Sequence, residues 1–166
     1  MARQLWLLRH AEAEPHGTRA DAERRLTERG VAQARVAGVA LQRLQADFDV
    51  VLFSPKARAR ETAELAAESW SEEQRARLSE HPALAGDFRA PDAREALART
   101  AADAQVLLVG HEPDLSRLVA ELSGGSVDLK KGGVAVMRLE RTRGELVALL
   151  RPRELALIAG VPVDGK

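Results

Sequence analysis

Short apolar runs separated by helical patterns constrain this chain more than any other feature of its sequence. The runs cover residues 4–8, 50–53 and 106–109, and each is long enough for one buried strand but too short for a helix. Apolar spacing, caps and breakers predict helices over residues 28–44, 57–70, 92–101 and 114–122. Strands that alternate with helices are typical of an α/β sandwich with a mostly parallel sheet.

The last part of the chain shows a pattern typical of a hairpin. An apolar run over residues 134–139 follows Gly132-Gly133, and an Arg143-Gly144 turn leads to a second run over residues 146–150. We expect this hairpin at or near an edge of the sheet, beyond the strands that alternate with helices.

The pattern weakens between residues 71 and 91. Charged residues, His81-Pro82 and Gly86 predict a loop there, with at most a short strand near Leu84. A chain of 166 residues has the size of one ordinary domain. The sequence therefore predicts a single domain over residues 1–166, folded as a three-layer α/β/α sandwich.

Composition and charge exclude several classes of protein. The 25 Lys and Arg residues balance the 25 Asp and Glu residues, so no overall field draws the chain to nucleic acid or an anionic membrane. Cysteine is absent, which excludes thiolate nucleophiles and cysteine zinc sites. The first apolar run is too short for a signal peptide and no run could span a membrane. We expect a cytoplasmic protein that binds neither nucleic acid nor membrane.

Unusual side chains follow the predicted strands. Arg9 and His10 follow the first strand, His111 follows the third, and Arg58 lies at the start of the helix after the second. Taken singly, each has an ordinary structural explanation as a polar strand end or a solvated helix residue. Because ligands bind beyond the carboxyl ends of parallel strands, we expect these four side chains to converge at one solvent-facing edge.

Such a group would suit a phosphoryl ligand. The planar guanidinium of arginine holds two oxygens of a phosphoryl group, and a neutral imidazole can attack its phosphorus to form a covalent phosphohistidine. A zinc site would need a ligand set such as His-Glu-x-x-His, which the sequence does not contain. We therefore expect chemistry without a metal or another cofactor.

Three motifs in order resemble those of the histidine phosphatase (phosphoglycerate mutase-like) superfamily. Leu7-Leu8-Arg9-His10-Ala11-Glu12 is similar to its Arg-His-Gly signature, with Ala11 at the glycine position. The stretch over residues 54–63 is similar to its Ser-Pro-x-x-Arg-Ala-x-Gln/Glu-Thr motif, and residues 109–113 surround the second histidine. The small size and the segment from Asp21 to Gly30 resemble the short SixA-type phosphohistidine phosphatases, which carry a similar Arg-Pro-Leu-Thr-x-x-Gly run. The resemblance covers essentially the whole chain.

The resemblance implies a role for each candidate residue. His10 would be the nucleophile, Arg9 and Arg58 would bind the phosphoryl oxygens, and His111 would stabilise the group in transfer. Arg24 falls where it could touch substrate, with a solvated charge as the alternative.

The chain departs from the family pattern in one respect. Mutases and broad phosphatases of the family carry a glutamate that acts as general acid in the region matching residues 82–86, where this chain has none. Asp87 is the nearest carboxylate. The resemblance thus favours a phosphatase that acts on phosphohistidine in a partner protein, of the histidine-containing phosphotransfer type. The alternatives are a small-molecule phosphomonoesterase and a catalytically silent module that binds a phosphorylated partner.

Overall fold

Six strands form one mixed sheet in the order β3-β2-β4-β1-β5-β6. The computed structural model describes residues 2–141 and 143–162. The strands are β1 (Arg3–Arg9), β2 (Val50–Phe53), β3 (Leu78–Glu80), β4 (Gln105–Gly110), β5 (Val134–Glu140) and β6 (Arg143–Leu150). Strands β1 to β4 are parallel, whereas β5 pairs antiparallel with β1 and β6 pairs antiparallel with β5. The mostly parallel sheet and its hairpin at one edge are confirmed.

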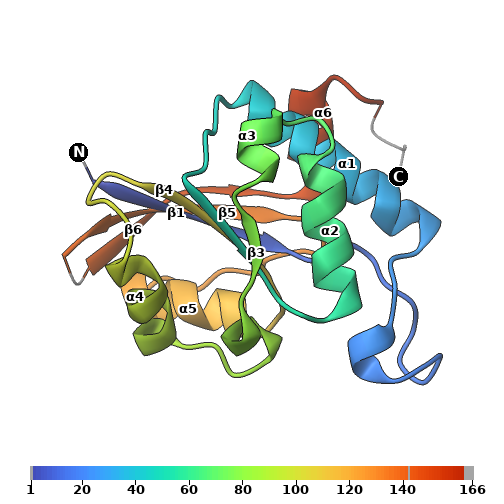
Figure 1. Cartoon of the computed structure of the whole chain (residues 1–166), viewed down its shortest axis with the longest axis horizontal. Helices are drawn as coiled ribbons and strands as arrows, with labels where there is room; N and C mark the ends of the chain where they lie inside the picture. Colours follow the sequence, from blue (N-terminus) through green and yellow to red (C-terminus); the bar gives the residue numbers. More distant parts are fainter. Residues whose placement is uncertain (1, 142, 163–166) are drawn as a thin grey trace.

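Helices cover both faces of this sheet, which gives the three predicted layers (Figure 1). One face packs against α1 (Glu28–Arg43), α2 (Ala57–Ala67) and α6 (Pro152–Ala159). The other face packs against α4 (Ala90–Ala98) and α5 (Asp114–Ser123). The connections contain α3 (Glu72–Arg75) and the short 3-10 helices η1 (Asp21–Glu23) and η2 (Pro82–Ala85). Within the two described ranges, no helix is long and apolar enough to cross a membrane.

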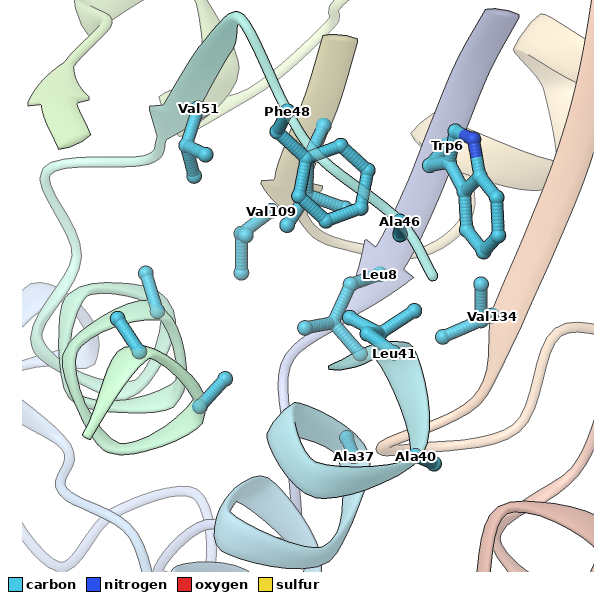
Figure 2. Close-up of a cluster of buried hydrophobic side chains, with 14 of the residues drawn as sticks. Trp6, Leu8, Ala37, Ala40, Leu41, Ala46, Phe48, Val51, Val109 and Val134 are labelled. Atoms are coloured by element: carbon cyan, nitrogen blue, oxygen red, sulfur yellow. The ribbon is translucent and has the colours of Figure 1, made fainter. Parts of the chain in front are cut away.

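Strand β1 shows how the apolar runs build two cores. Trp6 and Leu8 belong to the cluster under α1, α2 and α6, while Leu5 and Leu7 belong to the cluster under α4 and α5. Figure 2 shows the first cluster, in which Leu8 lies beside Leu41 of α1. Because successive side chains of a strand face opposite sides, a run that is apolar throughout is buried on both.

The loop that follows β1 is fixed against the start of α1. Thr27 caps this helix as predicted, since its side chain accepts a hydrogen bond from the Gly30 amide at 3.1 Å. A Cβ on Gly30 would lie 1.9 Å from the carbonyl oxygen of Glu12, so only glycine allows this close approach. The close approach holds the chain just beyond His10 in place.

Residues 71–91 are more structured than the sequence predicted. They contain α3 and the edge strand β3, while Leu84 lies in η2 and is buried among the side chains under α5. The predicted strand near Leu84 is therefore wrong, because Pro82 at the start of η2 has no N–H to pair with a neighbouring strand.

Three predicted boundaries also shift. The second helix ends at Ala67 rather than at residue 70, where the Trp70 indole instead donates to the carbonyl of Gly38 at 3.0 Å. The helix predicted over residues 92–101 spans Ala90–Ala98, with a proline in its first turn. Arg143 and Gly144 belong to β6 and not to the turn before it.

Candidate active site

The ends of β1 and β4 bring His10 and His111 together. Arg9 at the end of β1 pairs in register with Gly110 at the end of β4, so the next residue on each strand is a histidine. The His10 amide also donates to the Gly110 carbonyl at 3.0 Å. The two imidazole rings lie 5.2 Å apart between centroids and are tilted by 52°.

Hydrogen bonding determines which nitrogen of His10 can react. Nδ1 of His10 lies 2.8 Å from the carbonyl oxygen of Ala11. A carbonyl only accepts hydrogen bonds, so Nδ1 carries the proton and Nε2 keeps its lone pair. Burial, and then the positive charges of Arg58, Arg9 and Lys131, lower the pKa of His10 to about 3. The ring is therefore neutral near neutral pH and can act as a nucleophile.

His111 is held by a serine from the end of β2. Its Nε2 lies 2.7 Å from the Ser54 hydroxyl, which also accepts a hydrogen bond from the Lys56 amide at 3.2 Å. Burial, and then the neighbouring His10 and Arg58, lower the pKa of His111 to about 3. If Ser54 donates its hydroxyl proton to Nε2, the proton of the neutral ring lies on Nδ1, which is buried and has no partner among the described residues.

Two arginines present unpaired donors beside the histidines. Arg9 donates from Nη1 to the Leu129 carbonyl at 3.0 Å, and Arg58 donates from Nη1 to the Asp21 carbonyl at 2.7 Å. Burial lowers the pKa of both guanidinium groups. In the described part of the chain the Nε atom of each arginine is buried and has no partner. A phosphoryl oxygen could accept a hydrogen bond from each Nε–H group, since buried N–H groups are normally hydrogen-bonded.

These side chains line a cavity of about 200 Å³. It is lined by Arg9, His10, Ala13, Glu14, Pro15, His16, Arg24, Arg58, His111, Glu112 and Lys131. The cavity thus unites all five residues predicted from the sequence. The expectation that Arg58 and His111 face solvent is wrong: their exposed fractions are 5% and 6%, because the loop from residue 13 to residue 25 covers the sheet edge.

Arg24 is a buried side chain that lines the cavity, with an exposed fraction of 7%. The alternative of a solvated charge is therefore wrong. Its guanidinium donates to the carbonyl of Glu14 at 2.6 Å and to the carboxylate of Asp21 at 3.0 and 3.2 Å.

Sequence reasoning missed the charged residues Lys131, Glu14 and Glu112, which line the cavity, and Asp21, which contacts Arg24 and Arg58 beside it. Lys131 precedes Gly132, whose amide lies 3.1 Å from the carbonyl oxygens of Arg9 and His10. Two lysines followed by two glycines and a strand were the available signal. Asp21 lies in the loop after β1, where no periodic pattern singles it out.

Asp87 does not line the cavity. Its side chain is 81% exposed and pairs with Arg117 at 3.4 Å. The carboxylates that do line it belong to Glu14, which accepts from Arg19 at 2.7 Å, and Glu112, which accepts from the Ser116 amide at 3.0 Å. Among residues 2–141 and 143–162, no three or more His, Cys, Asp or Glu side chains group as metal ligands would.

Comparison with known proteins agrees with this geometry. A model of the histidine phosphatase superfamily (branch 1) matches residues 5–85. A protein of Picosynechococcus, described as uncharacterized, is 31% identical over 172 aligned positions that cover 92% of this chain and 98% of that protein.

Two solved structures are similar along nearly their whole length. The protein histidine phosphatase SixA complexed with tungstate is 26% identical, with a TM-score of 0.80 over 92% of this chain and 99% of that one. A putative phosphohistidine phosphatase SixA from Nakamurella multipartitia is 28% identical, with a TM-score of 0.76 over 92% of this chain and 97% of that one.

The family match and the similar SixA structure show that this chain is a phosphatase. The chain belongs to the histidine phosphatase superfamily, and within that superfamily it is of the SixA type.

Proposed function

We propose that the chain removes the phosphoryl group from phosphohistidine in a partner protein, through a covalent intermediate on His10 and without a metal. One observation supports this most strongly: a neutral His10 lies in a cavity lined by Arg9, Arg58 and His111, and Nε of each arginine and Nδ1 of His111 are buried without a partner in the described part of the chain. The similar SixA structure holds tungstate, an oxyanion. A partner of the histidine-containing phosphotransfer type in the cytoplasm is part of this proposal.

In the first step, Nε2 of His10 attacks phosphorus opposite the leaving group. The new P–N bond forms as the bond to the substrate imidazole breaks. The substrate ring carries a proton on its other nitrogen, so it leaves as neutral imidazole and the departing nitrogen keeps the electron pair. Arg9, Arg58 and His111 donate to the phosphoryl oxygens, where negative charge increases in the transition state.

In the second step, water attacks the phosphorus of phosphohistidine 10. The P–N bond breaks, its electron pair returns to Nε2, and the proton of the water leaves with phosphate or passes to solvent. The Ala11 carbonyl holds Nδ1–H throughout, so His10 returns to its starting tautomer.

The leaving group explains the preference for phosphohistidine. An alcohol leaves as an alkoxide and needs an acid, and the region over residues 82–86 has no glutamate to supply one. Imidazole leaves far more readily, since its conjugate acid has a pKa of about 6.5. The loop residues that border the cavity, Pro15 and His16, are exposed, which suits a residue displayed on another protein.

A panel of substrates tests this proposal. We expect kcat/KM at neutral pH to be much larger for a phosphohistidine protein or phosphoramidate than for phosphoserine or sugar phosphates, with aryl phosphates between them. Activity should survive a chelator. Glu14→Gln and Glu112→Gln should leave phosphoramidate turnover within a few-fold of the wild type.

Three results would contradict the proposal in different ways. Faster turnover of serine or sugar phosphates, lost in one of the two glutamine variants, would identify a small-molecule phosphomonoesterase with a carboxylate acid. Phosphate binding without any turnover would identify a silent module. Loss of activity to a chelator, restored by one divalent ion, would overturn the mechanism without a metal.

A further inference from the structure

Asp21 joins three cations beside the cavity. Its Oδ1 accepts from Nε and Nη2 of Arg24 at 3.2 and 3.0 Å. Its Oδ2 lies 2.9 Å from Nζ of Lys56 and accepts from Nη2 of Arg58 at 3.3 Å. Its backbone carbonyl accepts from Nη1 of Arg58 at 2.7 Å. Lys56, and then Arg24 and Arg58, hold the pKa of Asp21 below its usual range, so the carboxylate is ionised.

The contacts of Asp21 decide which edge of Arg58 is free. A guanidinium has five N–H donors. It can bind an oxyanion with two hydrogen bonds, either from its two Nη atoms or from Nε and one Nη. Asp21 takes one donor from each Nη of Arg58. The buried Nε, which has no partner in the described chain, is left for a ligand in the cavity.

Asp21 also offsets repulsion between two buried guanidinium groups. Arg24 and Arg58 are 7% and 5% exposed, and the positive charge of Arg24 lowers the pKa of Arg58. A carboxylate that contacts both guanidinium groups stabilises the two positive charges where they lie close together. Arg24 gives its Nε edge to Asp21, so Arg24 contributes to the site by holding this carboxylate.

We infer that Asp21 is a positioning residue, which fixes Arg58 with its Nε edge toward the phosphoryl group and is itself held by Arg24. The inference rests on the proposed phosphatase function. Asp21 does not line the cavity, so we expect its effect on turnover to pass through the arginines that it contacts, chiefly Arg58.

Asp21→Ala and Asp21→Asn test the inference, with Glu23→Gln as the matched control. Glu23 is an exposed acid in the same 3-10 helix and does not line the cavity. With an aryl phosphate, we expect Asp21→Ala to lower kcat by up to about 100-fold, since small misplacements of a catalytic group cost that much. Asp21→Asn keeps an oxygen acceptor and should fall between Asp21→Ala and the wild type. Glu23→Gln should match the wild type.

A double-mutant cycle with Arg58→Lys separates positioning from other roles. If Asp21 acts through Arg58, adding Asp21→Ala to Arg58→Lys should change kcat less than two-fold, which is a strongly non-additive result. Additive losses would overturn the inference. So would a rise in kcat/KM with tighter inhibition by inorganic phosphate, which would show that Asp21 competes with the ligand for the arginines. Unchanged kcat in both Asp21 variants would overturn it as well.

Wild-type measurements on the same preparations keep the two proposals apart. If the wild-type protein releases no phosphate, the proposed phosphatase function is wrong. If instead the wild type turns over and the Asp21 variants equal it, only the role of Asp21 fails. Asp21→Asn should lower the melting temperature, because it removes the charge that offsets the buried guanidinium groups of Arg24 and Arg58, so kcat is compared well below the melting temperature of each variant.

Discussion

Single hydrogen bonds give the two histidines of the cavity different roles. The Ala11 carbonyl fixes the proton of His10 on Nδ1 and leaves Nε2 with the lone pair that the proposed nucleophile needs. Ser54 contacts Nε2 of His111, and Nδ1 is buried without a partner in the described chain, so in the proposed mechanism Nδ1 is the atom that donates to the phosphoryl group. The Ser-Pro motif after β2 therefore supports the second histidine, although sequence reasoning gave the serine no role.

Replacing Arg58 or His111 with alanine should lower kcat by about 10²- to 10³-fold, because each removes one fixed donor to developing charge. Arg60→Ala is the control: Arg60 is exposed, and its Nη2 donates to the Pro55 carbonyl at 3.1 Å. Equal losses from Arg58→Ala and Arg60→Ala, in phosphate-release assays with an aryl phosphate, would contradict the assignment.

The melting temperature of each variant must be measured together with its kcat. Arg58 and His111 are buried, so both substitutions should also lower the melting temperature, contrary to what an exposed sheet edge would allow. Lys56 is no neutral control, because it pairs with Asp21 at 2.9 Å. Assays well below the melting temperature of each variant separate lost turnover from lost fold.

At the scale of elements, the length of each helix or strand decided whether the sequence pattern could predict it. The strands and helices that position the catalytic group, β1, β2, β4, α1 and α5, carry clear patterns and were predicted closely. The four residues of α3 and the three of β3 are too short to show a period. The α6 helix was not predicted, although Pro152 in its first turn and the buried Leu155 and Ala159 were signals for it.

The residues of the cavity also divide into those that a sequence pattern could locate and those that it could not. His10, His111, Arg9 and Arg58 follow strands or begin a helix, so a rule about parallel sheets located them. Asp21 lies in the short 3-10 helix η1 and Lys131 in the turn before β5, and their place in or beside the cavity depends on how distant loops fold back. Arg24 was ambiguous for the same reason, since only tertiary contacts show that it is buried.

Close packing of α1 on α2 gives an element-scale prediction. A Cβ on Gly38 would lie 1.9 Å from the Ala66 carbonyl oxygen, so the helices would have to separate. Gly38→Ala should lower the free energy of unfolding by about 1–3 kcal/mol, despite the better helix propensity of alanine. Gly86→Ala is the matched control, because a Cβ there meets nothing within 4 Å and its φ of 173° is extended. Urea unfolding that ranks the two variants equally would contradict this packing.

At the scale of the whole molecule, zero formal charge conceals a local concentration of positive charge. The chain carries 25 basic and 25 acidic residues, yet Arg9, Arg24, Arg58 and Lys131 all line one cavity. That local charge favours an anionic ligand and disfavours protonation of the buried histidines.

Stability should therefore fall as pH drops from about 6.5. His10 and His111 have folded pKa values of about 3, against about 6.5 when unfolded, so the unfolded chain binds more protons. Their contribution is complete above pH 6.5 and is lost toward pH 3, at up to about 1.4 kcal/mol per pH unit for each histidine. The carboxylates whose pKa is lowered, such as Glu154 at about 2, change the free energy of unfolding at lower pH than the histidines do.

Urea unfolding between pH 8 and pH 5 measures this effect. A variant with both His10→Asn and His111→Asn should show a much flatter dependence than the wild type, because it lacks both buried imidazoles. A wild-type stability that is constant or rises from pH 7 to pH 5 would contradict buried, neutral histidines.

Covalent labelling of His10 tests the central claim most directly. Wild-type protein mixed with a radiolabelled phosphoramidate and quenched during turnover should carry an acid-labile, alkali-stable phosphoryl group, mapped to His10 by digestion and mass spectrometry. His10→Ala should carry no label and release no phosphate above background, whereas Arg60→Ala should match the wild type. Phosphate release from His10→Ala at a rate similar to that of the wild type would contradict a phosphohistidine mechanism at this residue.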